Sequence, residues 1–142
     1  MNDPEIRPLT REEIAPHIPL LVSEGFTPEI DQGWWLGGFA DGTLAGFVRV
    51  FELDGAPMLE DDWVFPNHRR RGLARTLIET TRRDLDHLWL ICDDPMVAYY
   101  EALGFRLRPK EEFPPALAAL YSDKREWPEA PDHNHNAMHW SR

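Results

Sequence analysis

The chain has very little cysteine and no long apolar run, and both absences narrow what it can be. Its 142 residues include one cysteine, Cys92, so an internal disulfide cannot form and a reducing cytoplasm is the simplest compartment. No apolar run approaches the roughly 18 residues that span a bilayer. The opening residues MNDPEIRPLT lack the basic and apolar regions of a secretory signal. We therefore expect a cytoplasmic protein with no membrane partner.

Basic charge is scarce as well. The chain carries 15 Lys and Arg against 25 Asp and Glu, a formal net charge of -10. This surplus of carboxylates argues against a nucleic-acid binder, which needs a basic face, and favours a neutral or cationic substrate. Hydrophobic residues make up 42% of the chain, and neither an internal repeat nor a linker divides it. The sequence therefore predicts a single domain over residues 1–142.

One stretch concentrates the basic charge that the rest of the chain lacks. Residues 64–74, VFPNHRRRGLA, begin as a strand and run through Arg69, Arg70 and Arg71 to Gly72, where a helix opens. A helix N-terminus attracts anions because its first N–H groups are unpaired and its dipole is positive there. Glycine removes a Cβ that would obstruct a ligand. The arginines alone would suggest a solvated patch or a nucleic-acid contact, but with the glycine and the strand–helix junction the stretch predicts a diphosphate pocket.

Periodicity and turn signals place the other elements. Strands are expected at residues 5–9, 34–40, 43–53, 58–65, 88–92, 105–108 and 137–141. Helices are expected from the Thr10-x-x-Glu13 capping box, through residues 20–22, over 73–86, over 95–104 behind a cap at Asp94, and over 116–121. Apolar stripes are predicted at Leu73, Leu77, Ile78 and Leu85, and at Met96, Tyr99, Tyr100 and Leu103. This order predicts an α+β fold with a sheet of mixed direction.

Two motifs resemble the signatures of the GNAT superfamily of acyl-CoA N-acyltransferases. Arg69-x-x-Gly72-x-Ala74 is similar to Q/R-x-x-G-x-G/A, and YEALGF at residues 100–105 is similar to the Y-x-x-L-G-F that follows the fifth strand. The resemblance extends over residues 5–108. It implies a mixed, mostly antiparallel twisted sheet of six to seven strands with helices on both faces. It also implies a V-shaped splay between strands four and five.

The resemblance further implies acetyl-CoA as the acyl-donor substrate, with its pantetheine arm along strand four and its diphosphate on the turn that follows. The donor-binding residues that it implies are Asp62, Trp63, Val64, Arg69, Arg70, Arg71, Gly72, Leu73 and Ala74. Two positions depart from the family pattern. Ala74 replaces the commoner second glycine, and Asp93 stands where many members have asparagine, which puts the polar contact made there in doubt.

The implied reaction is acetyl transfer to a primary amine by direct attack on the thioester, and it needs a base and an acid. The resemblance puts Tyr100 beside the leaving thiolate as the acid, with Tyr99 as a stand-in. Glu60 and Asp61 are candidates for the base or for an amine-binding anion. Strand alternation sends Glu60 and Asp62 to one face and Asp61 to the other. The alternative interpretation is a strand start with solvated carboxylates.

The remaining chemistry-bearing residues suggest no further site. His133, His135 and His139 have a loose spacing with no cysteine or acidic ligand beside them, so we expect no metal. Cys92 fits a core position better than a nucleophile. We expect a small-molecule or peptide amine as acceptor, no nucleic acid, and a homodimer as a possible assembly. The alternative function is a non-catalytic acyl-CoA-binding or sensing module with the same fold.

Overall fold

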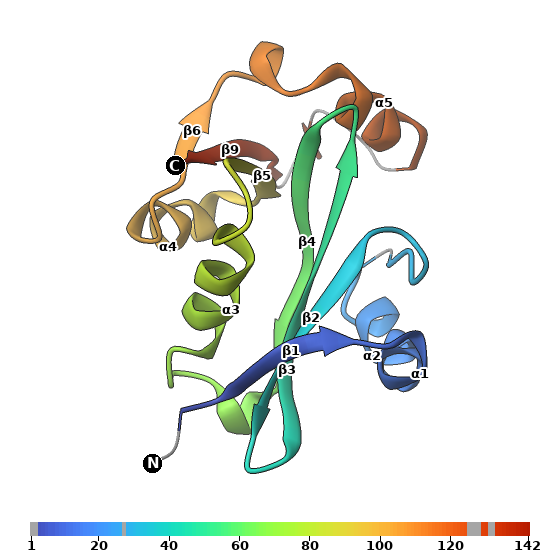
Figure 1. Ribbon diagram of the computed structural model, residues 1–142. Coiled ribbons are helices and arrows are strands. Elements are labelled where there is room, and N and C mark those ends of the chain that lie inside the picture. The colour runs from blue at the N-terminus through green and yellow to red at the C-terminus, as the bar shows by residue number, and fades with distance from the viewer. Residues whose placement is uncertain (1–2, 27, 125–128, 131–132) are drawn as a thin grey trace. The chain divides into compact units, whose positions relative to one another are not determined.

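The computed structural model describes residues 3–26, 28–124, 129–130 and 133–142, and the side chains among them except at 121–124, 129–130 and 133–134. The chain forms two compact units, one of Met1–Phe51 with Leu59–Asp84 and one of Glu52–Met58 with Leu85–Arg142. Both take residues from the long hairpin of β3 (Thr43–Leu53) and β4 (Ala56–Val64), seen in Figure 1. In the described part of the chain, no helix has the length and apolarity needed to cross a bilayer.

The strands of the first unit follow one another as an antiparallel meander. β1 (Glu5–Leu9) pairs with β2 (Trp34–Ala40), and β2 pairs with β3. The turn between β2 and β3 is Asp41-Gly42, with φ of 50° and 79°. Two positive φ angles give a tight hairpin whose twist matches that of its strands. The predicted bounds of these three strands are confirmed.

The first helical segment covers one face of this meander. It consists of α1 (Arg11–Ile14), a 3₁₀ turn (Ala15–His17) and α2 (Ile18–Ser23). Its apolar side chains join those of β2 and β3 in a buried cluster of Ile14, Leu21, Trp35 and Phe47. Prolines at the first or second positions of the 3₁₀ turn and of α2 divide the segment without costing an internal hydrogen bond.

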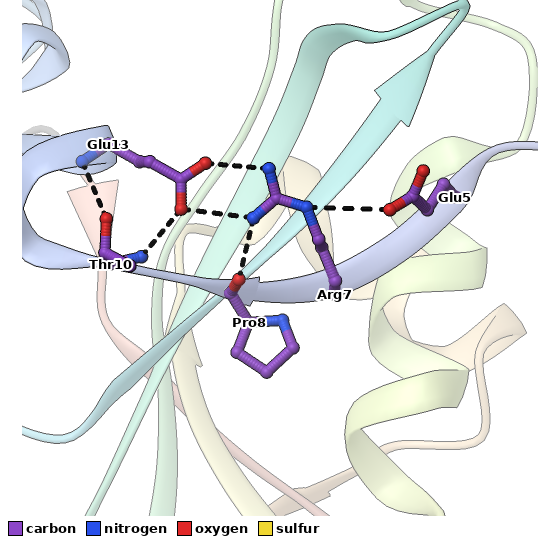
Figure 2. A network of polar contacts seen from close by, with 5 residues as sticks. All are labelled: Glu5, Arg7, Pro8, Thr10 and Glu13. Atoms are coloured by element: carbon purple, nitrogen blue, oxygen red, sulfur yellow. Dashed lines mark hydrogen bonds and ion pairs between the residues drawn. The ribbon is translucent and has the colours of Figure 1, made fainter.

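The predicted capping box at the start of α1 is present. The Thr10 hydroxyl accepts from the Glu13 amide at 3.2 Å, and the Glu13 carboxylate accepts from the Thr10 amide at 3.0 Å (Figure 2). The same carboxylate takes two hydrogen bonds from Arg7 of β1, at 3.1 Å and 2.7 Å. The cap therefore also anchors the strand to the helix.

The helix α3 (Leu73–Arg82) packs on the opposite face, where it buries Leu73, Leu77 and Ile78. Two glycines permit its close approach. A Cβ at Gly38 would lie 2.6 Å from Leu73 Cδ1, and one at Gly46 would lie 3.1 Å from Leu73 Cδ2. Gly38 and Trp35 lie on opposite faces of β2. Leu73 of α3 packs at Gly38, and the first helical segment packs at Trp35, so helices cover both faces of this unit's strands.

The prediction that this helix continues to residue 86 is wrong, because α3 ends at Arg82. Leu85 lies beyond that end and is not part of the buried stripe of the helix. The sequence supplies the reason: continued helix would place Asp84 and Asp86 at the negative end of the helix dipole, where carboxylates are unfavourable.

In the second unit, β9 (Asn136–Ser141) lies between β5 (His87–Cys92) and β6 (Arg106–Arg108), antiparallel to both. The start of β4 pairs with β5 in parallel, with Met58 opposite Trp89. The strand order is therefore β1-β2-β3-β4-β5-β9-β6, which confirms the mixed, mostly antiparallel sheet of seven strands. The parallel β4–β5 pair agrees with the expected splay of these strands. A separate two-residue pair joins β7 (Glu129–Ala130) to β8 (His133–Asn134).

The connections after β5 differ from prediction in detail. The chain enters α4 (Val97–Ala102) through a 3₁₀ turn (Asp94–Met96) whose N-cap is Asp93, so the predicted cap at Asp94 is wrong by one residue. The tighter turn advances the chain before α4 begins and changes which side chains share a face. Tyr100 and Leu103 are buried as predicted, whereas Met96 and Tyr99 are exposed.

The remaining helical segments are two 3₁₀ turns and α5. A 3₁₀ turn (Lys110–Glu112) precedes α5 (Pro115–Lys124), and a further 3₁₀ turn (Pro66–His68) connects β4 to the arginine-rich stretch. Between Glu112 and α5, the ring of Phe113 packs edge-on against Trp89 of β5, with centroids 5.5 Å apart.

Candidate active site

The turn between β4 and α3, residues 69–72, has the backbone geometry of an anion site. Arg70 and Gly72 both adopt left-handed conformations, with φ of 65° and 80°, and Gly72 is the N-cap of α3. No side chain caps the helix, and its first turn contains no acidic residue. Left-handed residues interspersed in a turn direct successive N–H groups into one concavity, which here adjoins the positive end of the helix dipole.

Space for a ligand is present at the same place. A Cβ built on Gly72 has no atom within 4 Å, so the glycine faces open volume, and its φ of 80° would strain any other residue. Beside the turn, Arg71 lines a cavity of about 290 Å³ together with His68 and Leu73. Open volume therefore adjoins the turn at Gly72 and at Arg71.

Of the three arginine side chains in the turn, that of Arg69 contacts the end of β4. Arg69 donates from Nε to the Val64 carbonyl at 2.8 Å, and its guanidinium lies 4.7 Å from the centroid of the Trp63 ring. Arg69 thus fixes the end of β4 to the turn. In the described part of the chain, no ion pair joins Arg69, Arg70 or Arg71 to a carboxylate. The positive charge of the turn is left available for a ligand.

The end of β4 lies close to β3 at Gly46, a glycine that the sequence pattern did not mark as part of the site. A Cβ at Gly46 would lie 2.8 Å from the Trp63 carbonyl oxygen and 3.2 Å from Val64 Cα. Only glycine permits this approach of β3 to β4. The Phe65 amide then donates to the Ala45 carbonyl at 2.9 Å. The strand segment 62–64 is therefore positioned by contacts on the side of β3.

The acidic segment of β4 does not alternate as predicted. Asp61 has a φ of 54°, a left-handed conformation within the strand, and this break in the pleat brings Glu60 and Asp61 to one guanidinium. Arg49 of β3 donates from Nε to Asp61 Oδ2 at 2.6 Å and from a terminal nitrogen to Glu60 Oε2 at 2.7 Å. The assignment of these two carboxylates to opposite faces is wrong for that reason.

The Arg49 cluster is buried. The side-chain exposure is 1% for Arg49, 0% for Asp61 and 11% for Glu60. Gln32 completes the cluster, accepting from the guanidinium with its backbone and side-chain oxygens at 3.2 Å each. A buried charge needs such pairing, because desolvation would otherwise be costly. The sequence signal was Arg49 itself, a charged residue inside the apolar run VRVF.

The motif at residues 100–105 is the C-terminal cap of α4. The Phe105 amide donates to the Tyr100 carbonyl and the Gly104 amide to the Glu101 carbonyl, both at 3.0 Å, with Gly104 at φ 96°. These are the two bonds of a Schellman motif, and the Tyr100 and Phe105 rings make its accompanying contact with centroids 5.9 Å apart. Tyr100 belongs to the second unit and is 6% exposed, with Tyr99 packed edge-on against it.

The structure describes the surroundings of His139 and Cys92, but not the side chain of His133. His139 lies 3.0 Å from His87 between ring nitrogens, while the side chain of His133 falls outside those described. Among the described side chains, no three of His, Cys, Asp or Glu come together to hold a metal. Cys92 is buried, with its Sγ 3.5 Å from the sulfur of Met138, as a core residue would be.

Comparisons with known proteins agree on one family. The family described as "Acetyltransferase (GNAT) family" matches residues 5–105. No curated protein sequence matches the chain. A GNAT acetyltransferase from Elizabethkingia anophelis with acetyl-CoA bound has a TM-score of 0.73 at 14% identity, over 100% of both chains. The ribosomal-protein-S18-alanine N-acetyltransferase of Escherichia coli has 0.67 at 19%, over 97% of this chain and 93% of its own.

A larger enzyme shares the fold. N-acetylglutamate synthase from Neisseria gonorrhoeae, complexed with coenzyme A and N-acetyl-glutamate, has a TM-score of 0.77 at 16% identity over 99% of this chain. This chain spans about a third, 35%, of that synthase chain. At such identities the likenesses establish the fold, while the family match rests on the sequence. The chain belongs to the GNAT family of acetyltransferases, whose acetyl donor is acetyl-CoA.

Proposed function

We propose that this protein transfers the acetyl group of acetyl-CoA to a primary amine. The observation that supports the proposal is the start of α3, which combines an uncapped helix N-terminus, a left-handed Gly72 and three arginines without carboxylate partners in the described chain. The E. coli relative is by name an N-acetyltransferase, which supports nitrogen as the accepting atom.

The chain's residues fit the donor along one continuous path. We expect the diphosphate at the turn of residues 69–74, because Gly72 faces open volume there and no side chain caps the start of α3. The pantetheine arm fits alongside Asp62, Trp63 and Val64, whose backbone is fixed by β3 and by Arg69. A backbone N–H near Val64 would polarise the thioester carbonyl.

The reaction requires two proton movements. A base removes a proton from the ammonium group, directly or through water, and the free amine attacks the thioester carbonyl carbon. The C–N bond forms, the C–S bond breaks, and the departing thiolate takes up a proton. No covalent enzyme intermediate is needed.

The geometry of the Arg49 cluster divides the roles of its two carboxylates. Glu60 keeps some exposure and is the carboxylate that we propose as base or amine-binding anion. Asp61 has no exposed side-chain surface, and we assign it the task of holding Arg49 and, through Arg49, Glu60. Glu60→Gln is expected to raise KM for the amine, or to lower kcat if Glu60 is the base.

Tyr100 is the residue that we propose as proton donor to the thiolate. Its phenol is protonated at neutral pH, with a reference pKa of about 10. General acid help is worth roughly 10²–10⁴-fold, so Tyr100→Phe should lower kcat by that order with little change in coenzyme A affinity. The exposed neighbour Tyr99 is the matched control, and Tyr99→Phe should leave kcat unchanged. A Tyr100→Phe protein with normal kcat would remove Tyr100 from the reaction.

The test of the proposal is release of free thiol from acetyl-CoA against a panel of amines that includes peptide N-termini, lysine, polyamines and amino sugars. Turnover with any primary amine, and acetylation of its nitrogen by mass spectrometry, would support it. Binding of coenzyme A without turnover on the panel would instead favour the non-catalytic acyl-CoA-binding module. We place the reaction in the cytoplasm, where a single free cysteine such as Cys92 stays reduced.

A further inference from the structure

A second hollow lies in the second unit, where strands β5, β9 and β6 contribute to its lining. Its volume is about 500 Å³. The side chains that matter for its chemistry are those of Trp89, Arg106, Arg108, Glu112, His139 and Ser141. We refer to it as the β6–β9 hollow.

The strand register arranges a row of cationic and aromatic groups there. His139 of β9 is directly opposite Arg106 on one side and Trp89 on the other, and its ring lies 4.4 Å from the Trp89 ring. Arg106 and Arg108 are two residues apart on β6, so both project from the same face. Opposite Arg108 stands the small Ala137, which leaves room above the strand.

The charge of the hollow is opposite to that of the protein. Glu112 already takes one hydrogen bond from Arg108 at 2.5 Å, whereas Arg106 has no ion-pair or hydrogen-bond partner among the described residues. Two guanidinium groups and one carboxylate leave a positive charge in a chain whose net charge is -10. An anion would find a counter-charge in this hollow.

His139 lines the hollow and contacts His87. Its capacity to donate hydrogen bonds to an anion depends on whether its ring is protonated. His139 faces His87 of β5 at 3.0 Å, Arg106 and Arg108 of β6, and Glu112 of the 3₁₀ turn. Burial lowers the pKa of His139, and His87 and Arg108 add to this, while Glu112 opposes it. The ring is therefore mostly neutral at pH 7. A bound anion favours the protonated ring, so anion affinity should rise as the pH falls.

We propose that the β6–β9 hollow is a binding site for a small dianion with oxyanion groups, held by Arg106, Arg108 and His139 above the Trp89 ring. Such a ligand takes hydrogen bonds from both guanidinium groups and replaces Glu112 as the partner of Arg108. This site goes beyond the acetyl transfer proposed above, and its ligand is a species other than the acetyl donor.

The test is a titration of the whole chain with inorganic sulfate or succinate at low ionic strength, followed by NMR of the backbone amides and by calorimetry. Saturable shifts of the amides in β6 and β9 are expected. Arg106→Gln should weaken binding about tenfold, because one charge-assisted hydrogen bond is lost. Glu112→Gln should strengthen it several-fold, because a competing carboxylate is removed.

The controls separate a local site from a general charge effect. Arg11→Gln removes the same charge from an exposed arginine of the first unit and should leave the affinity unchanged. Sulfate keeps its charge between about pH 5.5 and 7.5, so its affinity should fall over that range in the native protein and less steeply in His139→Gln. Shifts confined to the amides of 73–75, or equal losses in Arg106→Gln and Arg11→Gln, would overturn the proposal. Acetyl-transfer activity is not the readout, so failure here leaves the proposed function standing.

Discussion

Two arginines of the first unit each pair with two carboxylates, one at the surface and one in the interior. Arg7 is held by Glu5 and Glu13 at the surface (Figure 2), and Arg49 is held by Glu60 and Asp61 in the interior. Each guanidinium also lies over a phenylalanine ring, at 4.1 Å for Arg7 on Phe39 and 4.9 Å for Arg49 on Phe51. The side chain of Arg7 is 40% exposed and that of Arg49 is 1% exposed.

The difference shows how solvent sets the weight of an ion pair. Water can replace either partner of Arg7, so loss of that arginine leaves its carboxylates solvated. The side chain of Asp61 has no exposed surface, so loss of Arg49 would remove an ionic partner that water cannot readily replace. The arginines of residues 69–71 are a third case, with no carboxylate partner in the described chain. Arg7 and Arg49 serve the fold through carboxylate pairs, whereas Arg69 contacts the Val64 carbonyl and the Trp63 ring instead.

The largest effect should follow from Arg49→Met. Removing one partner of a buried ion pair costs about 3–5 kcal/mol, so the free energy of unfolding in urea should fall by about that amount. The outcome that would break the comparison is a loss below about 1 kcal/mol, which would mean that water reaches Asp61 once Arg49 is gone.

Gly72→Val should reduce the affinity for coenzyme A by at least about tenfold, because the side chain enters the volume that the diphosphate needs. Gly55→Val is the matched control. Gly55 has a φ of 78° and open space around it, like Gly72, but lies in the β3–β4 turn. Both variants carry a left-handed strain of about 1–2 kcal/mol. If calorimetry shows equal affinities for the two variants, the donor does not use the residue 69–74 turn.

Arg7→Met is the surface counterpart of Arg49→Met and should destabilise the chain far less. The Arg7 pairs are screened by water and salt, so the small effect should shrink further at high ionic strength. Urea unfolding at low and high salt checks this. A loss equal to that of Arg49→Met would show that exposure does not decide the weight of these pairs.

The smallest predicted effect is on the stability of the protein at acidic pH. The hydrogen bonds from Arg7, followed by the Thr10 amide, lower the pKa of Glu13 to about 2 from its usual value of 4.5. A carboxylate with a depressed pKa stabilises the folded state above the unfolded pKa, and that contribution disappears as the pH falls from about 4.5 to about 2. Melting temperatures of the native protein and Glu13→Gln should therefore converge over this window. A gap that stays constant with pH would contradict the low pKa.

Much of the fold was open to prediction because its signals are local. The Asp41-Gly42 turn set the ends of β2 and β3, and the Thr10–Glu13 capping box set the start of α1. The Tyr100–Phe105 motif is likewise a local cap, since both of its bonds join residues at most five positions apart. Such features depend on the φ and side-chain preferences of a few consecutive residues. These preferences can be inferred from the sequence without knowledge of distant contacts.

The sequence by itself determined the chain order of the seven strands of the main sheet, the strand–helix junction at the arginine turn, and the family. Tertiary structure alone decided what the charged residues near that turn contact. Asp61, with its left-handed φ, contacts Arg49, which lies twelve positions earlier. The pairing of His87 with His139 spans 52 positions and depends on the register of β5 with β9. The sequence pattern alone cannot predict these two contacts, because burial and strand register arise only when distant strands come together.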